Sequence, residues 1–344
     1  MRTFLLMVWL LVCATPLKAI EVNQGNLPGL AEAYGFVLGQ KLSLERIARE
    51  YPDLARDALL ARLSFERTFG DIHGKLRPKM VAFMGQELFQ QFHSDLNAQL
   101  EQINGQQEIT REIAEQFLEE VGNRRAKGDI YSPTLEYLLA IRFGDNPAQE
   151  YTKGFRQRYH TDGTGKSLGV ILNLQLPKSW QELEGNRPHI VRKWKSEAGT
   201  GMELIMLQVR GTEGVSVTRA DVAEMMQSGE IEGLIPEGGA LLDYGMVSVE
   251  GLPGYFMDFD VLMERAGMAV YQKMRQYSFF YHDRMISVQC SAGALESDYE
   301  SAEVRFERVK PLCVQVFNSV VLPDKYLRPE PERRGNEGVL MPAI

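Results

Sequence analysis

The spacing of apolar residues changes near residue 163, and this change constrains the fold of the 344-residue chain more than any other feature. Before it, apolar residues recur every three or four positions, which is typical of amphipathic helices. After it, the apolar period approaches two, which is typical of strands with one buried face. The turn-rich segment 160–165 separates the two patterns. The sequence therefore predicts an α+β protein, with an all-helical domain over 21–160 and an antiparallel-sheet domain over 161–322.

The second domain should contain several strands and a closing helix. Thr218 and Asp221 have the spacing of a capping box, which predicts a helix beginning there. A last helical pattern covers 302–320, and the residues after it, 323–344, are expected to form a disordered tail because 329–334 contain no apolar residue. The predicted strands cover 168–176, 190–195, 203–209, 241–249, 255–263, 268–281 and 285–290.

The first nineteen residues have the layout of a secretory signal peptide. Arg2 supplies the positive start, an apolar run covers 4–14, and a short segment ends at Ala19. We therefore expect export, with the working protein periplasmic or secreted, although Leu17 leaves the cleavage site open. The alternative is a lipoprotein anchored at Cys13, which is disfavoured because Val12 stands where a small residue is expected.

Charge and hydropathy exclude two classes of partner. The chain has 46 acidic and 38 basic residues, a net charge of −8, and no basic block, which argues against nucleic-acid binding. No apolar run after the leader approaches the roughly 20 residues of a membrane-spanning helix. We therefore expect no membrane span in the mature chain.

Two cysteines, Cys290 and Cys313, remain after the leader. Cys290 shares one face of a predicted strand with Ile286 and Val288, and Cys313 lies on the apolar stripe of the last helix. If that helix covers this strand face, the two sulfurs can form a disulfide, which an exported chain permits. The alternative is two buried free thiols.

No catalytic or cofactor site is predicted. Gly163–Ser167 resembles part of a phosphate-binding loop, but His160 occupies the position of its first glycine and a strand follows instead of a helix. The five histidines lack the spacing of a metal site, so no metal is predicted. Asp258 and Asp260 alternate with Phe259 and are expected on the outward face of a strand. These observations favour a non-catalytic protein and leave the enzyme question open.

One segment of the second domain contains residue types that are common at interfaces. Trp180 follows Pro177 at the end of a predicted strand, where its ring would cover the edge of the sheet. The alternative is a recognition surface, because tryptophan and arginine are enriched in binding hot spots. The candidate binding residues are Trp180, Arg187, His189 and Trp194.

These residues also carry a family resemblance. A strand that runs into Pro177 and Trp180, a strand that ends near Trp194, and a third strand over 203–209 resemble the PsbP/Mog family, over about 167–322. The resemblance implies an α/β/α sandwich and a non-enzymatic binding or assembly protein, without transferring any functional residue.

Together these observations predict an exported cell-envelope protein that recognises a protein partner through the sheet domain, with the helices used for docking or dimerisation. The alternatives are a periplasmic enzyme, such as a hydrolase, and a small-ligand carrier. In either alternative the site would form only in the fold. A hydrolase would need a pocket with titratable groups of opposed pKa, whereas a carrier would need a deep, mainly apolar pocket.

Overall fold

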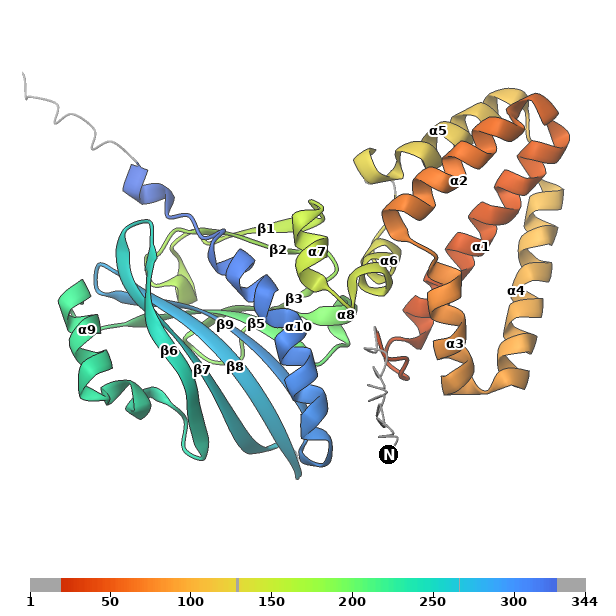
Figure 1. The fold of residues 1–344 in the computed structure, drawn as a ribbon. Helices are drawn as coiled ribbons and strands as arrows, with labels where there is room; N and C mark the ends of the chain where they lie inside the picture. The colour runs from red at the N-terminus through yellow and green to blue at the C-terminus, as the bar shows by residue number, and fades with distance from the viewer. Residues whose placement is uncertain (1–19, 128–129, 266, 327–344) are drawn as a thin grey trace, which may run out of the picture.

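The computed structural model describes residues 20–127, 130–265 and 267–326, in a helical half and a sheet half (Figure 1). This arrangement confirms the predicted α+β class. The predicted leader, residues 1–19, lies outside the described residues, as does most of the predicted tail. Of that tail, Pro323–Tyr326 forms a short 3-10 helix. No helix in the described part of the chain is both long and apolar enough to span a membrane.

The helical half is organised around its first helix. Leu30, Tyr34 and Leu38 lie on one side of this helix at intervals of four and are buried against the helices that surround it. The first helix contacts four of the other helices, so it forms the centre of this half. The helices are α1 (Leu27–Glu50), α2 (Ala55–Phe69), α3 (Ile72–Met84), α4 (Gln86–Gln106), α5 (Arg111–Lys127) and α6 (Thr134–Phe143).

The sheet half begins earlier than the pattern of apolar residues indicates. Ala148 and Tyr151 of the short helix α7 (Pro147–Thr152) are buried in the core of the sheet half. The next segment, β1 (Arg156–His160), pairs antiparallel with β2 (Asn173–Pro177). The predicted helical domain extends to residue 160, whereas the helical core ends at Phe143. The difference arises because three of the five residues of β1 are Arg, Arg and His, so this segment lacks the alternation of apolar residues by which a strand is predicted.

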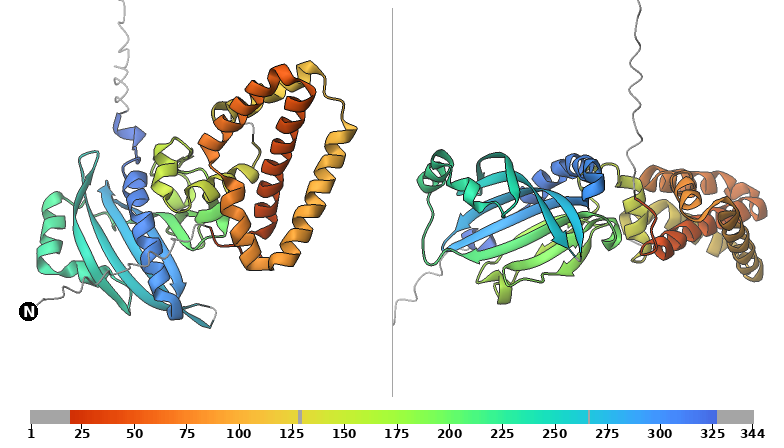
Figure 2. Two further views of the ribbon diagram at one scale, coloured as in Figure 1. Left: turned by 45° about the vertical axis from the view of Figure 1, so that its right-hand side comes forward. Right: turned by 90° about the horizontal axis from the view of Figure 1, so that it is seen from below.

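Seven antiparallel strands form the main sheet, which is curved and lies beside the helical half (Figures 1 and 2). The longest strands lie together in the middle and at one edge, where they form a continuous antiparallel meander. In spatial order the strands are β3 (Gln181–Glu184), β4 (Ile190–Lys195), β5 (Glu203–Gly211), β9 (Arg284–Leu295), β8 (Met268–Tyr281), β7 (Leu252–Arg265) and β6 (Gly239–Val249).

Helices cover both faces of the sheet, but to different extents. The closing helix α10 (Tyr299–Phe317) packs on β9, β8 and β5, where Ile286 and Val288 point toward it. On the opposite face, α9 (Arg219–Ser228) covers only the β6–β7 end, where it packs over Tyr255 and Phe259. Directly paired residues share a face, so β4, β5 and β9 continue this face beyond α9. Among residues 20–127, 130–265 and 267–326, no helix covers that part of the face.

A disulfide bond joins the sheet to the closing helix. Cys290 of β9 and Cys313 of α10 are both fully buried, with their Cα atoms 6.1 Å apart. This separation lies within the usual range for a disulfide. The bond fixes the middle of α10 to the central strand of the sheet.

A candidate binding groove on the open face of the sheet

A groove of about 600 Å³ crosses the sheet face opposite α10. Strands β5, β9 and β8 form its floor. The connection before β4 forms one side, and β7 with the segment after the 3-10 helix Glu230–Leu234 forms the other. The lining residues of β5 run from Leu204 to Arg210, so the floor is about 20 Å long at roughly 3.3 Å per residue. The groove therefore has the length of about six extended residues.

Polar side chains form the floor of this groove. Gln208 of β5 donates a hydrogen bond from Nε2 to Oε1 of Gln289 on β9, at 2.6 Å. Gln289 in turn points its Nε2 at the sulfur of Met274, at 2.7 Å. Ser287 and Ser291 lie on the same face of β9. All four residues are buried, and the side chains of Gln208, Gln289 and Ser287 are hydrogen-bonded, so they hold a fixed polar surface rather than a purely apolar one.

Methionines are the commonest apolar residues that line the groove. A methionine side chain is unbranched and polarizable, so it adapts to ligands of different shape. Five of the chain's 15 methionines line this one surface. They are Met206, Met257, Met263, Met274 and Met285.

One end of the groove is positively charged. Arg210 stands near the end of β5, and the backbone N–H of Val209 donates to the carbonyl of His189, at 3.0 Å. Arg187 lies two residues before His189 and lines the same groove. The pKa of His189 is held below its ordinary value by burial and then by the positive charges of Arg210 and Arg187. The three side chains therefore form one electrostatic cluster, which we call the cationic end.

The structure separates the four candidate binding residues. Arg187 and His189 line the groove. Trp180 and Trp194 are 3% and 0% exposed and belong to the core under α10, so a recognition role for these two is wrong in this structure. Trp194 packs edge-to-face on Tyr159 with ring centroids 5.0 Å apart. The tryptophans are structural because the β1–β2 hairpin, whose pairing the sequence pattern hides, covers them.

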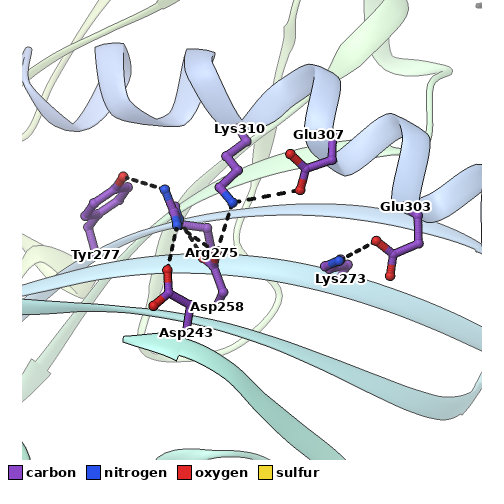
Figure 3. A network of polar contacts seen from close by, with 8 residues as sticks. All are labelled: Asp243, Asp258, Lys273, Arg275, Tyr277, Glu303, Glu307 and Lys310. Carbon is purple, nitrogen blue, oxygen red and sulfur yellow. Dashed lines mark hydrogen bonds and ion pairs between the residues drawn. The ribbon is translucent and has the colours of Figure 1, made fainter. Parts of the chain in front are cut away.

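A second polar cluster lies on the other face of the sheet, between the strands and α10 (Figure 3). Asp258 accepts two hydrogen bonds from the guanidinium of Arg275, at 2.5 and 2.7 Å, and Nζ of Lys310 on α10 lies 3.4 Å from the same carboxylate. Asp258 is 3% exposed, which corrects its predicted outward position. The reason is that α10 covers this face of β7 while α9 covers the other.

A third cluster lies where the two halves meet. Glu150 accepts hydrogen bonds from the N–H and hydroxyl of Ser179, and Glu203 pairs with Arg308 of α10. Glu197, in the turn α8 (Ser196–Gly199), has a left-handed backbone with φ of 54°. The cavity among these residues is about 20 Å³, enough for one water molecule. Burial raises the pKa of both Glu150 and Glu197, to about 7 and about 8.

This third cluster lacks the features expected of a hydrolase. Its cavity does not have room for a substrate, and the pKa values of its two perturbed carboxyls move in the same direction. Within residues 20–127, 130–265 and 267–326, no group of three or more His, Cys, Asp or Glu side chains is placed to hold a metal ion. The groove is therefore the best candidate site.

No protein-family model matches the sequence, and no curated protein matches it at a significant level. Among solved structures, the chain is similar to cyanobacterial PsbP (CyanoP) from Synechocystis, with 17% identity and a TM-score of 0.33 over 48% of this chain and 92% of that one. It is also similar to the Ran-binding protein Mog1p of Saccharomyces cerevisiae, with 10% identity and a TM-score of 0.34 over 50% of this chain and 97% of that one.

A third similar structure is LpqN of Mycobacterium tuberculosis, described as involved in cell envelope biogenesis. It has 13% identity and a TM-score of 0.30, over 51% of this chain and 96% of that one. Each of these similarities covers about half of this chain. They concern the fold alone.

Proposed function

We propose that this chain is an exported, non-catalytic binding or assembly protein of the cell envelope, which recognises a protein partner through its sheet domain. The observation that carries the proposal is the open groove of about 600 Å³ on the sheet face opposite α10. Export rests on the predicted leader, and the buried disulfide of the sheet half is compatible with an oxidising compartment.

The lining of the groove favours an extended protein segment as its occupant. Glutamine amides and serine hydroxyls both donate and accept hydrogen bonds, so they match the alternating N–H and C=O groups of an extended backbone. Methionines accept side chains of varied shape. Three cationic side chains and one carboxylate, Glu264, line the groove of a chain whose net charge is −8, so the complementary segment is acidic.

The same lining disfavours the two alternatives. A small-ligand carrier needs an enclosed, mainly apolar pocket, whereas on the floor of this groove amides and hydroxyls alternate with methionines. An enzyme needs titratable groups that face a substrate. The two carboxyls whose pKa is raised among the described residues, Glu150 and Glu197, instead face a cavity for one water molecule.

Site-specific photo-crosslinking in intact cells tests the proposal. A photoreactive amino acid is placed at Met206 or Gln276, both in the groove, and at Val314, which is exposed on α10. We expect one discrete crosslinked protein from the two groove positions and none from Val314. The reason is that only the groove positions face the bound segment.

A second control places the same photoreactive group at Leu59, which is 46% exposed in the helical half. Crosslinks from Leu59 with none from the groove would show that the partner binds the helical half instead of the groove. Such a result would contradict the proposal, as would equal crosslinking from Val314 and Met206.

A further inference from the structure

We infer that the cationic end of the groove is a carboxylate site, where an acidic side chain of the bound segment lies between Arg187 and Arg210 and where His189 takes up a proton as that side chain binds. This inference rests on the proposed function, because it assumes that a protein segment occupies the groove. It adds the chemistry of one contact, the direction of the segment and a dependence on pH.

The guanidinium groups of the two arginines have no protein partner within the described structure. Arg187 and Arg210 are exposed, and neither guanidinium makes a hydrogen bond or an ion pair with another residue among those described. Several other guanidiniums of the sheet half are compensated: Arg275 pairs with Asp258, Arg308 with Glu203 and Arg192 with Glu182. Exposed arginines without an ion pair to any described residue also occur elsewhere in this half, at Arg158 and Arg219, but Arg187 and Arg210 line the same groove. Planar carboxylates are the groups that such donors bind best.

His189 lies close enough to both charges to be affected by them. It is partly buried, and its carbonyl is held by Val209, so the residue is fixed at the edge of β5 next to Arg210. The groups that act electrostatically on its ring are Arg210 and Arg187, and both oppose its protonation. A bound carboxylate would screen both guanidiniums and attract a proton to the imidazole. Binding of an acidic segment and protonation of His189 should therefore favour each other.

The charges also give the groove a direction. Glu264 is the one carboxylate among the described residues that line the groove. It lies nine residues along β7 from Tyr255, and Tyr255 lies near Arg210, at the cationic end of the groove. An acidic side chain is therefore accepted at the Arg187–Arg210 end and repelled near Glu264. A segment with its acidic residue at one end can lie in the groove in only one favourable direction.

Selection from a random octapeptide phage library tests the carboxylate site. The full chain is immobilised, and bound peptides are sequenced and aligned. We expect Asp or Glu to be enriched several-fold at one terminal position of the aligned peptides. The double variant Arg187→Gln/Arg210→Gln should lose this enrichment while still selecting peptides. The matched variant Arg56→Gln, an exposed arginine of the helical half, should keep it.

A pH titration tests the role of His189. Affinity for the best acidic peptide is measured by fluorescence anisotropy from pH 8 to pH 6. Because the bound state holds the proton more tightly than the free state, affinity should rise as the pH falls, by up to about tenfold for each unit by which binding raises the pKa of His189. The variant His189→Gln should bind with little pH dependence over this range.

The outcomes separate this inference from the proposed function. Selected peptides without an acidic preference, or affinity that rises with pH, would overturn the carboxylate site while leaving the groove as a peptide site. Failure to select any peptide, together with no crosslink from Met206, would overturn the proposed function itself. Competition of sodium palmitate with the peptide for the groove would assign the cationic end to a lipid and would also overturn the inference.

Discussion

Arg275 and Asp258 form a bidentate ion pair on the sheet face that α10 covers (Figure 3). Each charge compensates the other in a place from which water is largely removed, and the guanidinium also lies 4.9 Å from the centre of the Phe256 ring. Removing one partner of such a pair leaves a buried charge without compensation, which costs more than the pair itself contributes. Asp243 approaches the same guanidinium at 3.8 Å, but its carboxylate is mostly exposed.

The variant Asp258→Ala should therefore be strongly destabilised. We expect its free energy of unfolding to fall by about 3–5 kcal/mol, the usual cost of breaking a buried pair. The variant Asp243→Ala should lose less than about 1 kcal/mol, because exposed pairs contribute little. Urea unfolding of both variants checks this. Equal losses would contradict the view that burial, rather than proximity to Arg275, decides the effect.

The sequence indicates which residue types are suited to recognition, but it does not indicate whether each such residue lies in the core or at the surface. Arg187 and His189 were singled out as recognition residues and lie in the groove. Trp180 and Trp194 were grouped with them, since a tryptophan in a sequence has the same appearance in a core as at an interface. Arg210 was missed, because only the pairing of β5 with β4 brings it beside His189.

Helix α10 is held on the sheet by the disulfide between Cys290 and Cys313. The two cysteines are 23 residues apart, so the bond closes a loop that also contains the β9–α10 connection. In the chain-entropy model, a loop of this length restricts the unfolded chain enough to stabilise the fold by about 3 kcal/mol.

The variant Cys290→Ala/Cys313→Ala should therefore unfold at a lower urea concentration, with a loss of about 3 kcal/mol. The same loss should appear in the unchanged protein when reductant is added. Alkylation after denaturation without reductant should label neither cysteine. Two labelled thiols in that experiment would refute the bond.

Among the elements, those with a clear apolar period were the ones that sequence could predict. The long strands β7 and β8 and helix α10 follow the predicted ranges closely. Strand β1 was missed, since its arginines and histidine conceal the strand period. The groove was missed for a different reason. Ser287, Gln289 and Ser291 alternate with buried apolar residues as an ordinary solvated strand face would, and only the placement of the flanking connections makes that face a groove.

The two halves of the molecule meet at a buried cluster of carboxyls. Glu150 is 1% exposed, and burial raises its pKa to about 7. Burial, and then the negative charge of Glu203, raise the pKa of Glu197 to about 8, although Arg308 and Arg305 of α10 oppose the shift. Ala198, next to Glu197, packs on the helical core, so this turn belongs to the joint between the halves.

Stability should consequently fall as the pH rises from about 5 to 8. The ordinary pKa of both carboxyls is 4.5, so over this range the folded chain holds protons that the unfolded chain releases. A fully shifted carboxyl contributes up to about 1.4 kcal/mol per pH unit, and the partly exposed Glu197 contributes less.

Urea unfolding at several pH values, followed by tryptophan fluorescence, measures this slope. Glu150→Gln and Glu197→Gln should each flatten it, whereas Glu45→Gln, an exposed carboxyl of α1, should leave it unchanged. Stability that increased between pH 5 and pH 8 would contradict the assignment of buried, protonated carboxyls at the joint.

At the scale of the whole molecule, the sequence predicted two structural halves of different class, because the apolar period changes between them. It could not predict the joint. Glu150, Glu197 and Glu203 are scattered along the chain and resemble ordinary charged surface residues until the fold buries them together.

Whether the groove holds a protein partner is decided by the yield of photo-crosslinks from Met206 compared with that from Val314. We expect a single crosslinked envelope protein from Met206 and none from the outer side of α10. Equal yields from the two positions, or a yield from Val314 alone, would contradict the proposed function.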